Sequence, residues 1–318
     1  MRTSTKVTNS DRYISERYFS DKKMTRLRKV MSMISIVLFM SSVMLVAVKG
    51  FNWGLDFTGG VVAEVQLSDQ VTKDDLKTKL DAAFQQDVQV VGMAEQDRWI
   101  LRYSQLTDAP QPNLVDVLSS VSDQVQVLNS SVVGPQVGQD MVDQGGLAVL
   151  VCFLMIMLYL SVRFEWRLAL GALAAIIYDV TLILGLFAFT QFEFNLTVLA
   201  AVLAILGYSL NDSIIIADRV REMLRGNPNG DTDNLLNESV KATFSRTMVT
   251  SGTTLITVSA LWLLGGAALQ GFAIALVVGI VSGTWSSVSV GITLPKLLGL
   301  QPCHYQVKAP VEVEGEYP

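Results

Sequence analysis

Long apolar stretches alternate with polar segments and give the chain its most regular pattern. Six of these stretches reach the length of about 20 residues that an α-helix needs to cross a bilayer. We place the predicted membrane spans near residues 30–48, 145–162, 168–190, 196–217, 247–265 and 271–294. The pattern therefore predicts a polytopic α-helical membrane protein with six transmembrane helices, of which five form a bundle within residues 145–294.

The polar segments between these spans predict two further features. Residues 226–233 ("GNPNGDTD") predict a turn, and residues 232–244 ("TDNLLNESVKATF") predict an amphipathic helix on the membrane surface. In the last span, small residues recur at the spacing that lets two helices approach each other closely. We interpret them as a packing face: Gly279, Ser282, Gly283 and Ser286.

Residues 50–143, between the first two spans, are numerous enough for a small domain. Alternating apolar positions predict strands, such as 61–67, and helical spacing predicts helices, such as 72–84. The predicted order is strand, helix, strand, strand, helix, strand, and the last strand ends before Gly134 and Pro135. This order is that of the ferredoxin-like α+β fold, which supports many functions and identifies none.

The distribution of charge predicts how the chain is oriented. Residues 1–29 hold nine basic residues, which should stay in the cytoplasm: Arg2, Lys6, Arg12, Arg17, Lys22, Lys23, Arg26, Arg28 and Lys29. Six spans then return the tail, residues 295–318, to the same side. The domain at 50–143 holds five basic and fourteen acidic residues and is expected outside the cytoplasm.

Composition narrows the functional classes. Half of the residues are hydrophobic, 17% are charged and the mean hydropathy is +0.41, which is typical of an integral membrane protein surrounded by lipid. The net charge of −5 argues against nucleic acid as a partner. Two cysteines and one histidine are too few for a disulfide framework or a usual zinc site, so no metal or organic cofactor is expected.

The segment "DFTGG", from Asp56 to Gly60, resembles a phosphate-binding loop at first sight. It lacks the lysine and the following helix that such a loop requires. Turn chemistry favours a simpler interpretation, in which Gly59 and Gly60 bend the chain from the first span into the first strand.

Polar residues inside the spans are the candidates for function. Tyr208, Ser209, Asp212 and Ser213 share one face of the predicted helix 196–217, and Asn211 lies at the edge of that face. A charged side chain near the middle of a spanning helix costs at least about 2.5–3.5 kcal/mol. Such a cost indicates that the carboxylate has a partner or a task.

Two other spans offer partners for this carboxylate. In span 247–265 and just before it, Arg246 heads a stripe of hydroxyl residues formed by Thr250, Thr253 or Thr254, and Thr257. Asp179 lies about midway through span 168–190. Either Arg246 pairs with Asp212 or it extends to the membrane interface, and the carboxylates either lock the helices together or line an ion path.

Four segments resemble the signatures of the SecF family, the smaller subunits of SecD–SecF protein-export complexes. They are "GLDFTGG" (54–60), "SVVGPQVGQDM" (131–141), "GYSLNDSIIIADRVRE" (207–222) and "SRTMVTSGTTL" (245–255). The resemblance covers nearly the whole chain and implies a relative of the resistance-nodulation-division exporters in the bacterial inner membrane. It implies that Asp212 and Arg246 are the intramembrane pair that couples a proton or sodium gradient to protein export.

The resemblance also implies the partners: SecD, the SecYEG translocon, unfolded secretory proteins and, as a further candidate, YajC. Two other functions stay open on the residues alone. The chain could be a passive scaffold that holds SecD beside the translocon, or half of a small-molecule exporter. The sequence shows no arrangement of catalytic residues that would favour an enzyme. A carboxylate among hydroxyl groups can bind a proton or a sodium ion equally well, so the sequence does not identify the coupling ion.

Overall fold

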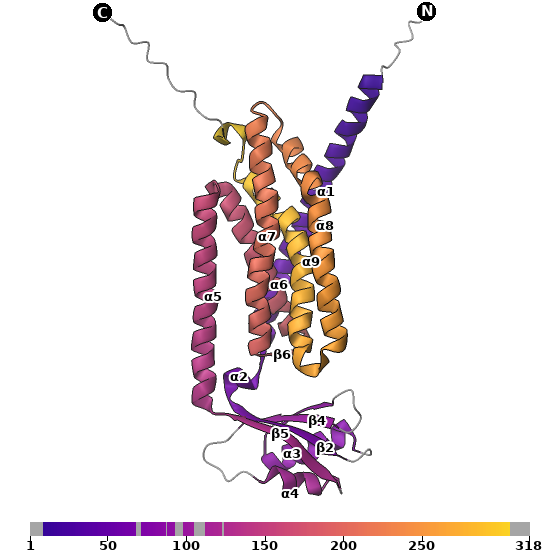
Figure 1. Cartoon of the computed structure of the whole chain (residues 1–318), viewed down its shortest axis with the longest axis vertical. Helices are drawn as coiled ribbons and strands as arrows, with labels where there is room; N and C mark the ends of the chain where they lie inside the picture. The colour runs from indigo at the N-terminus through magenta and orange to yellow at the C-terminus, as the bar shows by residue number, and fades with distance from the viewer. Residues whose placement is uncertain are drawn as a thin grey trace, which may run out of the picture.

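The computed structural model describes residues 9–67, 71–86, 88–92, 98–104, 112–122 and 124–305. Within this part of the chain, six helices are long and apolar enough to cross a membrane, which confirms the predicted class of fold. They lie side by side in one bundle, with a small domain at one end (Figure 1). These helices are α1 (Asn9–Lys49), α5 (Pro135–Arg163), α6 (Trp166–Thr190), α7 (Leu196–Gly226), α8 (Thr232–Leu264) and α9 (Gly266–Leu297).

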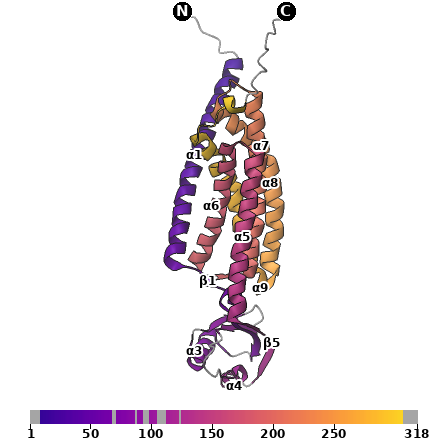
Figure 2. The same cartoon turned by 90° about the vertical axis from the view of Figure 1, so that its left-hand side faces the viewer.

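Helices α6 and α9 form the centre of the bundle, whereas α1 and α5 lie at its sides (Figures 1 and 2). About half of the residues in the apolar windows of α6 and α9 are buried, compared with 11% for α1 and α5. Glycines permit the close contacts at the centre. A Cβ on Gly171 of α6 would lie 2.6 Å from the carbonyl oxygen of Gly291 on α9, so only a glycine fits there.

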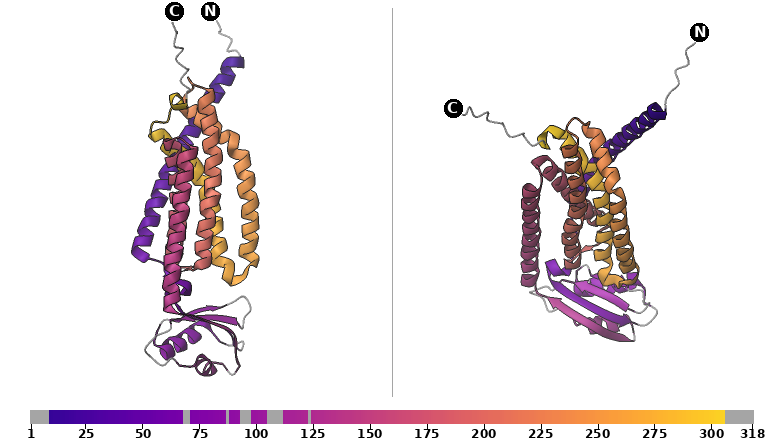
Figure 3. Two further views of the ribbon diagram at one scale, coloured as in Figure 1. Left: turned by 60° about the vertical axis from the view of Figure 1, so that its left-hand side comes forward. Right: turned by 45° about the horizontal axis from the view of Figure 1, so that its top comes forward.

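The small domain has the predicted ferredoxin-like topology. Its elements are β2 (Gly60–Leu67), α3 (Lys73–Phe84), β3 (Gln89–Gly92), β4 (Arg98–Tyr103), α4 (Leu114–Ser119) and β5 (Val125–Val133). The strands form an antiparallel sheet in the order β3-β4-β2-β5. Figures 1 and 3 show α3 and α4 on the face of the sheet turned away from the bundle.

The core of the domain lies between this sheet and its two helices, and Leu76 and Leu80 of α3 are fully buried in it. Replacing Leu80 with Ala should destabilise the domain by about 2–5 kcal/mol, because the substitution leaves a cavity. Thermal unfolding of the isolated full chain in detergent would measure the loss. The matched change Val115→Ala, at an exposed site on α4, should shift the midpoint little, and equal shifts would contradict the assigned core.

Short elements join the domain to the bundle. Strand β1 (Asn52–Trp53) pairs in parallel with β6 (Glu193–Phe194), which connects α6 to α7. Helix α2 (Leu55–Thr58) follows β1, and the chain then turns through Gly59 and Gly60, whose φ angles are 72° and 141°. A Cβ on Gly60 would also lie 2.6 Å from the carbonyl oxygen of Tyr103. Both the backbone conformation and the space therefore require glycine at position 60.

One sequence prediction is wrong at the start of α8. The predicted surface helix at 232–244 and the span at 247–265 form one continuous helix, whose first residues pack into the bundle: Leu235, Leu236 and Val240 are buried. No glycine or proline separates the two segments, so nothing ends the helix between them. The predicted turn lies just before α8, where the side chain of Asp231 caps the new helix.

Candidate functional site

The first buried carboxylate, Asp179, lies on α6 at the centre of the bundle and is fully buried. Its Oδ2 atom accepts hydrogen bonds from the hydroxyl of Ser209 on α7, at 2.5 Å, and from that of Ser286 on α9, at 2.9 Å. Gly283 of α9 lies beside the same oxygen, which a Cβ at that position would meet at an ordinary contact distance of 3.5 Å. Asp179 therefore joins three helices through one oxygen atom.

The second buried carboxylate, Asp212, lies on α7 and is 1% exposed. Its Oδ2 atom accepts a long hydrogen bond, 3.4 Å, from the hydroxyl of Ser251 on α8. Ser251 is also 2.9 Å from the hydroxyl of Thr284 on α9. Because Ser209 and Asp212 are about one helical turn apart on α7, that helix takes part in both carboxylate clusters.

Each carboxylate keeps one oxygen without a hydrogen-bond partner among the described residues. The Oδ1 atoms of Asp179 and Asp212 are both buried and unsatisfied, as are the hydroxyls of Tyr208 and Ser213 close by on α7. A buried ionised carboxylate is costly unless it is paired or hydrogen-bonded. Uptake of a proton or of a cation would remove that cost, so both sites are suited to bind a small cation.

The carboxylates lie between two apolar clusters of the bundle. On α6, Ile176 belongs to one cluster and Ile183 to the other, with Asp179 between them. On α7, Ile205 and Ile216 flank Asp212 in the same way. The polar groups are therefore enclosed in apolar surroundings on both sides along the bundle, which strengthens electrostatic interactions among them.

The structure does not bring every predicted residue into this site. Arg246 is exposed on α8 and forms no ion pair with Asp212 within 4.0 Å in the described part of the chain, so their pairing stays a prediction. Asn211 is also exposed. The hydroxyl of Thr250 donates to the carbonyl oxygens of Arg246 and Thr247 on its own helix. Among the described residues, neither Arg246 nor the hydroxyl of Thr250 therefore makes a hydrogen bond or a close ion pair with Asp212.

The inward face of α8 is offset by one residue from the stripe expected from the sequence. Its buried members are Thr243, Thr247, Ser251 and Val258, whereas Thr253 and Thr257 are exposed. Sequence analysis missed Ser251 and Thr284, and it assigned Ser286 to packing although its hydroxyl binds Asp179. The spacing of Thr243, Thr247 and Ser251, each four residues apart, is the signal that could have identified this face.

The glycine-rich segment at 54–60 lies beside the helix that carries Asp212. The side chain of Asp56 accepts a hydrogen bond from the backbone N–H of Leu196, the first residue of α7, at 2.9 Å. A carboxylate at a helix N-terminus is stabilising because it satisfies a free N–H group and interacts favourably with the helix dipole. The segment therefore fixes the start of α7.

The segment at 131–141 packs against the same glycine-rich segment. Gly134 precedes α5 and Pro135 is its first residue, where a missing N–H costs nothing. A Cβ on Gly138 would lie 2.8 Å from the carbonyl oxygen of Phe57 in α2. Two motifs that are about 75 residues apart in sequence thus form one joint between α2 and α5.

Side chains of the small domain attach to this joint. Arg102 of β4 forms an ion pair with Glu193 of β6, and the amide of Gln89 on β3 donates to Asn52 on β1 at 3.0 Å. Burial lowers the pKa of Arg102, and the carboxylate of Asp56 acts in the opposite direction. The domain is therefore bound to the connection between α6 and α7, the two helices that carry the buried carboxylates.

These features define a class: a polytopic membrane protein with two buried carboxylates in its bundle and one ferredoxin-like domain fixed to the helices that carry them. Residues 113–300 match the family model "Protein export membrane protein SecD/SecF, C-terminal", and residues 45–71 match the SecD/SecF GG motif. The chain therefore belongs to the SecF family of protein translocase subunits.

Individual relatives agree with this assignment. The chain is 40% identical to the protein translocase subunit SecF of Vibrio alginolyticus, over 92% of this chain and 93% of the relative. It is 34% identical to SecF of Escherichia coli O157:H7, over 89% of each. The crystal structure of SecDF, a translocon-associated membrane protein from Thermus thermophilus, matches with a TM-score of 0.78 at 32% identity. That match covers 86% of this chain but 38% of the SecDF chain.

Proposed function

We propose that this chain, together with SecD, uses the transmembrane gradient of protons or sodium ions to promote protein export. Its family places it in the protein translocase, and the proposal concerns how it contributes. The observation that carries the proposal is the pair of buried carboxylates, Asp179 and Asp212, each with one oxygen left unsatisfied among the described residues. Hydroxyl groups of Ser209, Ser251 and Ser286 supply further oxygen ligands.

The energy available from the ion gradient and the contacts between α7 and the small domain both support a coupling of ion movement to protein export. One elementary charge crossing the membrane releases about 2.3 kcal/mol per 100 mV, which is enough to shift a conformational equilibrium substantially. Binding of a cation at Asp212 would change the hydrogen bonding between α7 and α8. Since Asp56 and Glu193 hold the start of α7 near the small domain, a movement of α7 would reach that domain.

The proposal includes location and partners. By the charge rule, the start of α1 and the end of α9 lie in the cytoplasm, and the small domain lies in the periplasm. Both of those helix ends are far from the domain in Figures 1 and 2. The chain then acts in the bacterial inner membrane with SecD, next to the SecYEG translocon and YajC. Unfolded secretory proteins are its clients, and no organic cofactor takes part.

A passive scaffold is the second candidate. The hydrogen bonds that link Asp179 to α7 and α9 would favour it, because such bonds also hold helices together without any ion. A third candidate function, half of a small-molecule exporter, is not retained. The relatives that this chain matches over most of their length are protein translocase subunits.

Export into inner-membrane vesicles tests coupling directly. Vesicles that contain the wild-type chain and SecD should complete translocation of a reporter faster when a gradient is present. A protonophore should abolish the difference if protons drive the process, and removal of sodium should abolish it if sodium does. Stimulation that survives both treatments would contradict ion coupling and favour the scaffold.

A further inference from the structure

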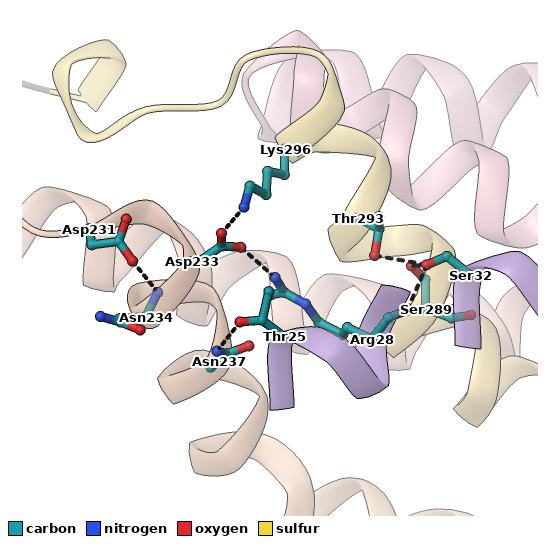
Figure 4. A network of polar contacts seen from close by, with 10 residues as sticks. All are labelled: Thr25, Arg28, Ser32, Asp231, Asp233, Asn234, Asn237, Ser289, Thr293 and Lys296. Carbon is teal, nitrogen blue, oxygen red and sulfur yellow. Dashed lines mark hydrogen bonds and ion pairs between the residues drawn. The ribbon is translucent and has the colours of Figure 1, made fainter. Parts of the chain in front are cut away.

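A basic pocket lies at the end of the bundle far from the small domain, between α1 and the start of α8. Its volume is about 410 Å³, and no part of the export mechanism described above uses it. Figure 4 shows the polar network around it, with α1 and α8 side by side. The pocket is lined by Lys22, Thr25, Arg26 and Lys29 of α1 and by Asp231, Asp233 and Asn234 at the start of α8.

The carboxylates of the pocket are already engaged by the protein. Asp233 accepts a hydrogen bond from Arg28 at 2.8 Å through one oxygen and forms an ion pair with Lys296 through the other (Figure 4). Asp231 accepts from the backbone N–H of Asn234 and caps α8. Among the described side chains in and behind the pocket, the carboxylates of Asp231 and Asp233 face the cations of Arg26, Arg28, Lys29 and Lys296. Positive charge is therefore in excess.

Arg28 adds donors that the protein does not satisfy. Its side chain is 3% exposed, and its Nε and Nη1 atoms have no hydrogen-bond partner among the described residues. Arg28 does not line the pocket and its buried donors do not open into it, but its charge adds to the positive potential behind the pocket. The electrostatic environment of the pocket thus favours a negatively charged ligand.

The surface that continues from the pocket along α1 is apolar. Arg26 is followed, at helical spacing on the same face, by a stripe of exposed apolar side chains: Val30, Met33, Val37 and Met40. A basic pocket directly above an apolar stripe matches a molecule with an anionic head and hydrocarbon chains. A water-soluble phosphate would leave the stripe unused.

We propose that this pocket binds the headgroup of an anionic phospholipid, whose acyl chains lie along the apolar stripe of α1. Basic pockets between membrane helices are suited to such headgroups. The cations at Arg26 and Lys29 contact the phosphate region, while Asp233 and Lys296 hold α8 and α9 together beneath it. The inference is independent of ion coupling and rests on the pocket and the apolar stripe beside it.

Native mass spectrometry of the full chain, purified from membranes together with SecD, tests the proposal with phosphatidylglycerol as the probe. The wild type should retain phosphatidylglycerol in preference to phosphatidylcholine. Each cation near the surface contributes about 1 kcal/mol to binding an anionic lipid, so Arg26→Gln with Lys29→Gln should weaken retention roughly 30-fold. The matched double variant Lys23→Gln with Arg225→Gln, at exposed cations outside the pocket, should retain the lipid.

Three results would overturn the proposal. Equal losses in the two double variants would show that overall charge, and not the pocket, attracts the lipid. Displacement of the lipid by millimolar inorganic phosphate would assign the pocket to a soluble anion. Binding by the chain alone but not by its complex with SecD would show that the stripe is a surface between subunits.

Discussion

Cells that carry Asp212→Asn in place of the wild-type chain should export a secreted reporter no better than cells depleted of the chain. Asparagine keeps the volume of the side chain and can still accept the hydrogen bond from Ser251. It cannot ionise, so it neither takes up a proton nor neutralises a sodium ion. The substitution therefore removes the proposed chemistry of Asp212 while leaving its packing in place.

The measurement is the accumulation of unprocessed reporter at matched membrane levels of the two chains, with copurification of SecD checked. Asp218→Asn is the matched control, because it makes the same change six residues further along α7. Asp218 pairs with Arg163 in a half-exposed ion pair, and such pairs contribute about 0–1 kcal/mol. If Asp212→Asn assembles with SecD and exports normally, the carboxylate is structural and the scaffold is the better account.

The helices and the domain topology were predictable because each depends on a local pattern. Six apolar stretches of spanning length can satisfy their backbone groups in a bilayer only as helices. In the domain, alternation and helical spacing follow one another in an order that few folds accommodate. The prediction failed at residues 244–247, where α8 continues, because a change in polarity was taken for a helix boundary.

The polar site was predictable only in part. Asp179, Ser209 and Asp212 stand out because charge and polarity are unusual within apolar spans. Their actual partners depend on how α8 and α9 rotate about their own axes, which is set by packing across the bundle. The stripe headed by Arg246 includes exposed residues of α8, while Ser251 on the buried face contacts Asp212.

The joint between domain and bundle follows from no local pattern. Asp56 caps a helix that begins 140 residues later, and Arg102 pairs with a residue 91 positions away. Such contacts require the complete fold. They also give the coupling proposal its second testable element, because an ion site can move a domain only if the two are physically connected.

Reversing the charge at Arg102 should break that connection and impair export at least tenfold. In Arg102→Glu, a carboxylate would face both Glu193 and Asp56, so attraction at the joint becomes repulsion. An ion-pair contact to a partly buried group contributes roughly 1.5–3 kcal/mol, and about 1.4 kcal/mol corresponds to tenfold in an equilibrium. The assay is export of the same reporter in depleted cells.

Rescue separates a specific link from general damage to the domain. Adding Glu193→Arg to Arg102→Glu restores the attraction between positions 102 and 193. Asp56 still faces a carboxylate at position 102, so export should recover in part. Arg98→Glu is the matched control, since Arg98 lies on the same strand and its carboxylate partner, Glu64, belongs to the domain itself. Failure of the double variant, with the domain folded and SecD bound, would mean that this ion pair does not transmit movement from α6 and α7. Recovery would identify the contact between β4 and β6 as the place where movements caused by ion binding at the buried carboxylates are transmitted to the small domain.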